Sequence, residues 1–196
     1  RSDNVCRNTL MAHGYGGRDQ CLRLLRRKRS FSARRLLSSV KLPERFWVGA
    51  FSRSRCIVPM LGYYEWTGEK GSKTPHWIHS DELLAAAGLT WTTEVTGERR
   101  RVFVVVTREA RDASGEIHAR MPAFLTRDLW DAWLDPQPLT VDGDNAASKQ
   151  NRLQLRDELE ASSSTIATTM RTHVVDRKVN NVRTVNPSDP SLIAAV

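Results

Sequence analysis

Two short segments of the chain carry side chains that can exchange protons. Glu65 lies in a run of apolar and aromatic residues, 56–66 (CIVPMLGYYEW), and His118 stands just before an Arg-Met-Pro sequence at 120–122. An apolar environment favours the protonated form of a carboxyl group, so a glutamate in such a setting can hold or release a proton near neutral pH. Histidine side chains change charge in the same pH range. Glu65 and His118 are therefore candidates for general acid–base catalysis.

Each of these residues also has a plainer interpretation. A lone glutamate usually lies on the surface, although the neighbours of Glu65 are of the kind that pack inside, where glutamate is rare without a partner or a purpose. His118 could be a structural histidine near a turn. Thr107 ends the strand-like run 101–107, where a hydroxyl commonly serves as a turn partner. Met121 is equally suited to the core, and the residues alone leave these alternatives open.

Three motifs, in this order, resemble those of the SRAP family (SOS response-associated peptidase, the abasic-site-processing proteins). They are residues 56–66, residues 117–122 (IHARMP) and residues 179–183 (VNNVR), and the likeness covers residues 46–196. The resemblance implies that Glu65 and His118 transfer protons at an abasic sugar. His118 would act at the ring oxygen, which opens the ring and exposes the aldehyde.

The resemblance also implies a set of DNA contacts: Arg34, Trp66, Thr107, Arg120, Met121 and Asn181. The guanidinium of Arg120 suits this role because its fork of donors matches phosphate oxygens. Met121 would act as a wedge, since apolar side chains can unstack a base step. Residues 32–34 (SAR) stand where the family has Asn-Ala-Arg, so Ser32 replaces the asparagine while Arg34 is kept.

The beginning of the chain departs from the family pattern. The family's reactive group is an N-terminal cysteine, whose thiolate and α-amine together form a five-membered thiazolidine with the sugar aldehyde. Here residue 1 is Arg1, and Cys6 lies inside the chain without a free amine. A shifted or late-starting reading frame, a fragment, or a divergent member that binds DNA without crosslinking would each explain this departure. The resemblance implies an abasic-site-processing protein that binds single-stranded DNA, forms a covalent protein–DNA crosslink at abasic sites in the DNA damage (SOS) response and has autopeptidase activity. Because the N-terminal cysteine is absent here, the covalent step and the enzyme class stay open.

Two further functions remain as alternatives. The chain could be a noncatalytic remnant that binds single-stranded DNA, which predicts salt-dependent affinity and no covalent product. It could instead be a hydrolase that uses Glu65 and His118 on a substrate unrelated to DNA, which predicts no DNA affinity.

Composition supports a nucleic-acid partner. The 196 residues carry a formal net charge of +8, and residues 1–30 contain eight Lys or Arg against two Asp. A basic chain favours polyanions, and we expect single-stranded or junction DNA with abasic sites as the partner of a monomer. Three cysteines without a CxxC pair fit a reducing compartment, so we expect a cytoplasmic protein, associated with the nucleoid in a bacterium. We expect no cofactor, no metal site and no membrane span.

The hydrophobic pattern predicts an α+β fold with a mostly antiparallel, barrel-like sheet and a few flanking helices. We expect a basic segment over residues 1–30 and a single domain over residues 31–196. The expected elements are helices at 43–51, 125–134 (with Thr126 as N-cap) and 149–160; strands at 56–58 (ended by Pro59), 63–66, 76–79, 85–91, 101–107 and 166–175; a turn at 68–73 and another at Gly97; and a polar loop at 142–148.

Overall fold

The computed structural model describes residues 45–69, 71–95, 97–110, 117–140, 145–181 and 183–196. The expected basic segment 1–30, the cysteines Cys6 and Cys21, and the family-like triplet that contains Ser32 and Arg34 lie outside the described residues. No helix in the described ranges is long and apolar enough to span a membrane.

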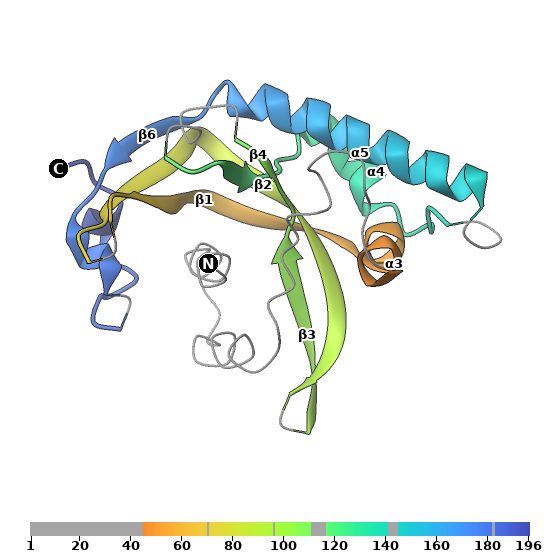
Figure 1. The fold of residues 1–196 in the computed structure, drawn as a ribbon, viewed down its shortest axis with the longest axis horizontal. Coiled ribbons are helices and arrows are strands. Elements are labelled where there is room, and N and C mark those ends of the chain that lie inside the picture. The colour runs from red at the N-terminus through yellow and green to blue at the C-terminus, as the bar shows by residue number, and fades with distance from the viewer. Residues whose placement is uncertain (1–44, 70, 96, 111–116, 141–144, 182) are drawn as a thin grey trace.

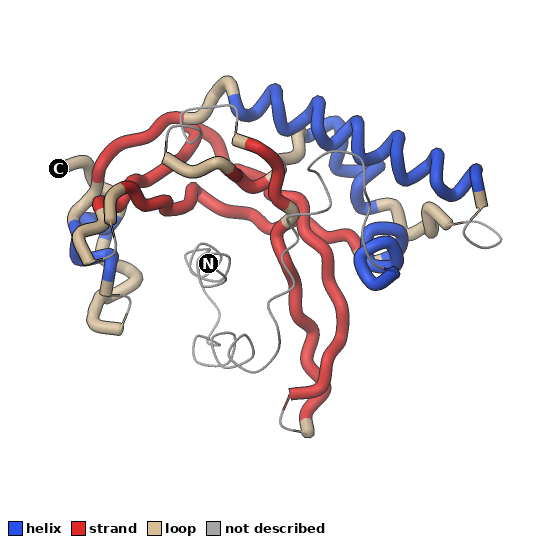
Figure 2. The backbone as a smooth tube through the Cα atoms, in the orientation of Figure 1, coloured by secondary structure: helices blue, strands red, loops and turns tan. Residues whose placement is uncertain are grey.

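The fold is α+β with a mainly antiparallel sheet, as predicted. Strands β1 (Arg55–Thr67), β2 (Thr74–Val95) and β3 (Glu98–Val105) follow one another as a meander, and β6 (Arg171–Val174) also pairs with β2. The short strands β4 (Thr107–Glu109) and β5 (Arg120–Pro122) form a second sheet. The main sheet is strongly curved, and within the described part of the chain it does not close into a barrel (Figures 1 and 2).

Strand β2 is the centre of the sheet. It pairs with β1 along one edge, whereas its other edge is shared by β3, by residues 123–125 and by β6. At the middle position the amide of Ala87 donates to the carbonyl of Ala123, and the amide of Leu125 donates to the carbonyl of Ala85, both at 2.8 Å. The two strands expected at 76–79 and 85–91 are therefore parts of one strand of 22 residues.

Strand β1 continues through Pro59, where the sequence analysis wrongly ended it. Pro59 lies opposite Ala85, and the carbonyl of Ala85 points away from β1 to accept from Leu125. Because hydrogen-bonding directions alternate along a strand, the nitrogen of Pro59 faces the outer edge of β1. Within the described residues this edge has no partner strand, so the missing N–H of proline breaks no ladder hydrogen bond.

Helices cover one face of the sheet. They are α3 (Arg45–Arg53), α4 (Trp130–Leu134), which follows the 3₁₀ turn η2 (Arg127–Leu129), and α5 (Ala146–Ala167). Trp133 is fully buried there; its Nε1–H donates to the carbonyl of Cys56 at 2.8 Å, and its ring meets the edge of Phe51 at 5.7 Å. This first core also contains Ala85, Ala87, Leu89, Val106, Leu155 and Leu159.

Two helices differ from the prediction. The helix expected at 125–134 is only a 3₁₀ turn and five α-helical residues, and Thr126 makes no side-chain cap. Helix α5 runs to Ala167, through residues expected to begin a strand. Ser162 and Ser163 explain both results, since their hydroxyls accept from the amides of Thr126 (2.7 Å) and Phe124 (3.0 Å). These tertiary bonds override the weak helix propensity of serine.

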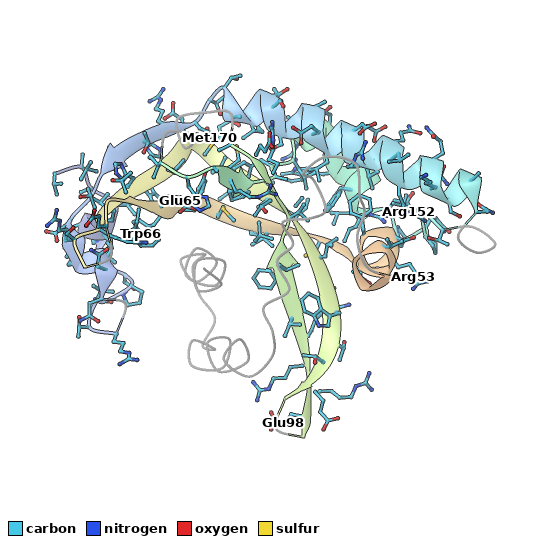
Figure 3. All side chains as sticks on the ribbon, in the orientation of Figure 1. Arg53, Glu65, Trp66, Glu98, Arg152 and Met170 are labelled. Atoms are coloured by element: carbon cyan, nitrogen blue, oxygen red, sulfur yellow. The ribbon has the colours of Figure 1, made fainter. Side chains whose placement is uncertain are left out.

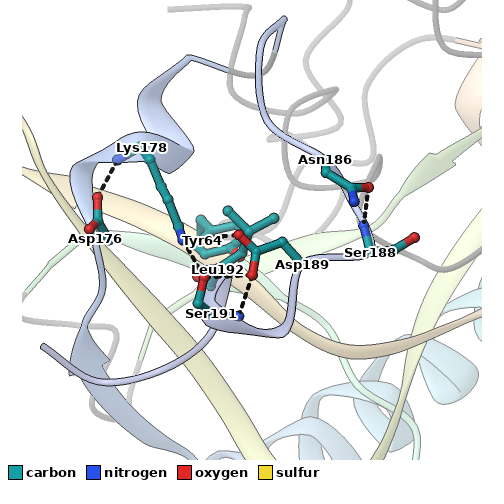
Figure 4. A network of polar contacts seen from close by, with 8 residues as sticks. All are labelled: Tyr64, Asp176, Lys178, Asn186, Ser188, Asp189, Ser191 and Leu192. Atoms are coloured by element: carbon teal, nitrogen blue, oxygen red, sulfur yellow. Dashed lines mark hydrogen bonds and ion pairs between the residues drawn. The ribbon is translucent and has the colours of Figure 1, made fainter.

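A polar network fastens the C-terminal segment to the sheet (Figure 4). Lys178 Nζ contacts Asp189 Oδ2 at 3.0 Å and also the hydroxyl of Ser191, and Tyr64 donates to the carbonyl of Leu192 at 3.0 Å. Hydrogen bonds from Ser191 and Lys178 lower the pKa of Asp189 to about 2. Beneath the network, Tyr64 packs with Trp77, Val175, Val179 and Leu192. The 3₁₀ turn η3 (Arg177–Asn180) carries Lys178 and Val179, and η4 (Pro190–Leu192), with Asp189 as its N-cap, carries Ser191 and Leu192.

Candidate functional site

A register shift in β1 determines the face of the sheet on which Glu65 lies. Met60 pairs with Leu84, but Gly62 pairs with His79, so the ladder is interrupted at Leu61. Without this shift, Met60 and Glu65 would point to opposite faces, because side chains alternate along a strand. In the structure, Met60 and Tyr63 belong to the same core cluster. Glu65, two residues after Tyr63, therefore lies on the face that Met60 also occupies.

Glu65 is buried on that face, with 5% of its surface exposed. Directly opposite on β2 is His76, whose Nε2 lies 2.9 Å from the hydroxyl of Thr67. Burial lowers the pKa of His76, so this ring is neutral at physiological pH. Glu65 thus lies among Tyr63, Thr67 and an uncharged histidine, which is a suitable environment for a carboxyl group that exchanges a proton.

Trp66 points to the opposite face and connects β1 to the third motif (Figure 3). Its Nε1–H donates to Asn180 Oδ1 at 2.6 Å, and Asn180 in turn donates to the carbonyl of Lys73 at 3.1 Å. Asn181, the residue named from the sequence, is exposed and follows the turn η3. The late motif therefore holds the β1–β2 turn through Asn180, a contact that no spacing in the sequence indicates.

The β4–β5 hairpin brings Thr107, His118 and Arg120 together. Arg120 Nη2 donates to the carbonyl of Thr107 at 2.5 Å and to its hydroxyl at 3.1 Å. The backbone amide of Arg120 donates to His118 Nδ1 at 3.1 Å. The carbonyl of Arg120 lies 3.1 Å from the same nitrogen, so the tautomer with Nδ1 as acceptor leaves a proton on Nε2, whereas the other tautomer donates from Nδ1 to that carbonyl.

A shared core places this hairpin on the face that carries Glu65. Ile117 and Met121, on either side of His118 and Arg120, both pack in the cluster that contains Tyr63. Met121 is only 1% exposed. The structure therefore gives Met121 the packing role that the sequence left open, and a wedge between bases would require this side chain to leave the core.

Behind the hairpin lies a charged residue that none of the sequence motifs indicated. Arg108 is fully buried, and its Nη2 lies 2.8 Å from Glu160 Oε1 on α5. The geometry makes this contact an ion pair rather than a hydrogen bond, since the three guanidinium nitrogens have no hydrogen-bond partner within the described structure. Alternation along β4 was a usable signal, because it turns Arg108 away from the face of Thr107. The pair connects the hairpin to the long helix.

Cys56 is a half-buried thiol that packs against the cluster containing Tyr63. Burial raises its pKa to about 11, and the positive charge of Arg101 opposes only part of this shift. The thiolate is the reactive form, so at pH 8 only about one thiol in a thousand is ionised.

We therefore expect Cys56 to react with iodoacetamide at least tenfold more slowly than an exposed peptide cysteine at pH 8. The rate should still rise about tenfold for each unit of pH up to pH 10. Peptide mapping by mass spectrometry, which separates Cys56 from Cys6 and Cys21, measures this rate. Rapid modification that levels off below pH 9 would contradict the raised pKa.

Comparison with known proteins places these residues in context. The model of the SOS response associated peptidase (SRAP) family matches residues 27–182, which extends the likeness beyond residue 46. The abasic site processing protein YMR114C of Saccharomyces cerevisiae is 30% identical over 116 residues, which are 57% of this chain and 30% of that protein. YoaM of Bacillus subtilis, which has the same descriptive name, is 34% identical over 93 residues, or 45% of this chain and 40% of YoaM.

The chain thus spans less than half the length of these curated relatives. Among solved structures, a protein of Bordetella bronchiseptica shares the fold with a TM-score of 0.55 and 19% identity, over 82% of this chain and 72% of that one. A protein of Bacteroides thetaiotaomicron gives a TM-score of 0.50 at 24% identity, over 75% and 59% of the two chains.

Proposed function

Because this chain belongs to the SOS response associated peptidase (SRAP) family, we propose that it processes abasic sites in single-stranded DNA, with Glu65 and His118 as the proton-transfer pair. One observation above all supports the proposal. The register shift at Leu61 turns a buried glutamate onto the sheet face where the hairpin of His118 packs. The relatives' shared name, abasic site processing protein, gives the class of substrate.

The proposed chemistry is the opening of the abasic sugar. The closed sugar is a hemiacetal, and opening it removes a proton from the hydroxyl on C1′ and delivers a proton to the ring oxygen. The ring C–O bond breaks as the aldehyde forms. His118 would donate to the ring oxygen through Nε2, and Glu65 as carboxylate would take the hydroxyl proton. General acid–base catalysis of this kind typically contributes about 10²–10⁴-fold in rate.

The phosphates beside the abasic sugar would be held by arginine. Arg120 now donates to Thr107, and a phosphate oxygen is a stronger, charged acceptor for the same donors. Thr107 would line the site, and we also propose Trp66, Arg34 and Asn181 as DNA contacts on the resemblance alone. Met121 would support the hairpin from within the core.

The covalent step requires a thiol and a free amine on the same residue. Cys56 does not meet this requirement, because its nitrogen is a peptide nitrogen within β1. We propose that a chain with an N-terminal cysteine forms the crosslink, and that autopeptidase activity exposes or releases that residue. Ring opening is a separate step. Residues 45–196 would catalyse it for any molecule that carries both a thiol and an amine and reaches the aldehyde.

Free L-cysteine allows the ring-opening step to be tested without a terminal cysteine. Its thiol and amine condense with the aldehyde to form a thiazolidine on the DNA, with loss of one water. We expect the protein to accelerate this reaction on abasic single-stranded DNA. Glu65→Gln should reduce the rate enhancement about 100-fold, since the amide cannot exchange the proton. Mass spectrometry of the oligonucleotide measures the product.

Glu69→Gln is the matched control, since Glu69 lies exposed in the turn after β1. This variant should react as the unmodified protein does. Equal rates for the Glu65 and Glu69 variants would refute the role of Glu65. Salt-dependent DNA binding without any acceleration would instead identify a noncatalytic DNA-binding module, and the absence of DNA binding would leave only a function unrelated to DNA.

A further inference from the structure

The ends of β2 and β3 extend beyond the core as a two-stranded arm, residues 90–95 and 98–103. Figure 1 shows the arm projecting away from the rest of the sheet. Its strands pair Thr90 with Phe103, Thr92 with Arg101 and Glu94 with Arg99. Gly97 at the tip has a φ of 83°, the left-handed conformation that glycine adopts without strain.

The two faces of the arm differ in how far they are covered. Residues directly opposite each other on paired strands share a face. Trp91 lies on one face, and it packs with Val104 at the base of the arm against the core formed by the helices. Phe103 lies on the other face with 46% of its surface exposed, and Thr92, Glu94, Arg99 and Arg101 on the same face are exposed as well. We call this second face, with Thr90, Thr92, Glu94, Arg99, Arg101 and Phe103, the open face.

The open face continues the face on which Glu65 lies. Cys56, Gly88 and Val105 are aligned in register across β1, β2 and β3. Val105 packs in the cluster that contains Tyr63, and Phe103 follows two residues further along β3. The charge of Arg101 also acts on the thiol of Cys56, where it opposes part of the effect of burial on the pKa.

The open face combines an aromatic ring with two arginines at strand spacing. Phe103, Arg101 and Arg99 follow one another at intervals of about 6.8 Å, two residues of an extended strand. Glu94 lies opposite Arg99, whereas Arg101 lies opposite the uncharged Thr92. Surfaces that bind single-stranded nucleic acid use this combination, because the cations hold the backbone while bases stack on the rings.

We infer that the open face of the arm binds the single-stranded DNA that extends from the abasic site, with Arg101 on a phosphate and Phe103 stacked on a base. Arg99 gives weaker support, since Glu94 offsets its charge. This inference rests on the proposed function, because it takes single-stranded DNA as the substrate. It adds a contact surface that lies outside the three family motifs.

Arg100 provides a matched control on the same strand. It alternates with Arg101, so it lies on the opposite face, where it pairs with Glu98. Arg101→Gln and Arg100→Gln change the net charge equally, so only a contact at the open face distinguishes them. We expect Arg101→Gln to weaken binding of an intact single-stranded oligonucleotide and to reduce the log–log salt slope by about 0.7, one phosphate contact. Arg100→Gln should leave both values unchanged.

Phe103→Leu keeps an apolar side chain but removes the stacking surface. We expect it to weaken binding on the order of tenfold, and thermal unfolding should show that the variants remain folded. An oligonucleotide too short to pass beyond the abasic site should bind all variants alike. Fluorescence anisotropy measures each affinity.

Several outcomes would overturn the inference. If the unmodified protein binds the long oligonucleotide but the Arg100 and Arg101 variants are equal, the arm is not a contact while the proposed function stands. If the unmodified protein binds no single strand, both fail. If it prefers a blunt duplex and Arg101→Gln abolishes that preference, the arm binds duplex instead.

Discussion

Glu160→Gln will lower the free energy of unfolding by about 3 kcal/mol, because it leaves the guanidinium of Arg108 buried without its counter-ion. The value is at the lower end for a buried pair, since 39% of the Glu160 side chain contacts solvent. Urea unfolding followed by circular dichroism measures the change. Glu158→Gln is the control on the same helix, two residues away and away from Arg108; it changes only a surface contact with Gln154 and should cost less than about 0.5 kcal/mol.

Replacing the other partner should have a different effect. Arg108→Met removes the buried charge and fills the same space with apolar atoms, so its stability should stay within about 1 kcal/mol of the unmodified protein or exceed it. Adding Glu160→Gln to that variant should then cost little. If Glu160→Gln and Glu158→Gln destabilise equally, Arg108 does not depend on the ion pair.

Trp133→Ala will cost about 3–5 kcal/mol of unfolding free energy, which makes it the most damaging truncation in the first core. The ring is fully buried, meets Phe51 edge-on and donates to the carbonyl of Cys56. Trp133→Phe should cost less, because it retains most of the volume and loses the hydrogen bond, which contributes about 1 kcal/mol. Thermal and urea unfolding both report the difference.

Trp130 is the internal comparison for this prediction. It is half-buried on the same helix, with Arg127 5.1 Å from the centroid of its ring. Trp130→Ala loses this cation–π contact, a long hydrogen bond to the carbonyl of Leu125 (3.4 Å) and only half-buried packing, so it should cost less than Trp133→Ala. Equal costs for the two tryptophans would mean that the core around Trp133 rearranges to fill the cavity.

The fold class followed from local sequence patterns because each pattern depended on neighbouring residues alone. The turn at 68–73 lies between Thr67 and Thr74 as expected, and Gly97 turns the chain at the tip of the arm. Long-range contacts determine the element boundaries that local patterns do not predict. Pro59 is tolerated because of which edge it faces, and residues 166–167 are helical because serines from α5 bind the backbone beside β2.

The candidate site was predictable in its residue types but not in its geometry. The family resemblance named Glu65, His118, Thr107 and Arg120. In the structure the side chain of Arg120 donates to Thr107, and its backbone amide donates to His118. The face of Glu65 depends on a register shift that leaves no trace in composition. The Arg108–Glu160 pair joins residues 52 positions apart, which no local pattern reveals.

The length of β2 also determines the order in which the sheet can assemble. Its pairing with β1 requires only a six-residue connection, and its pairing with β3 requires two residues. Its pairing with β6 joins His76 to Val174, so almost a hundred residues must be synthesised in between. Loop closure of that length is slow compared with hairpin formation. On the ribosome, we expect the edge at residues 76–79 to stay bare until the last strand emerges, which makes it the segment most exposed to misassembly.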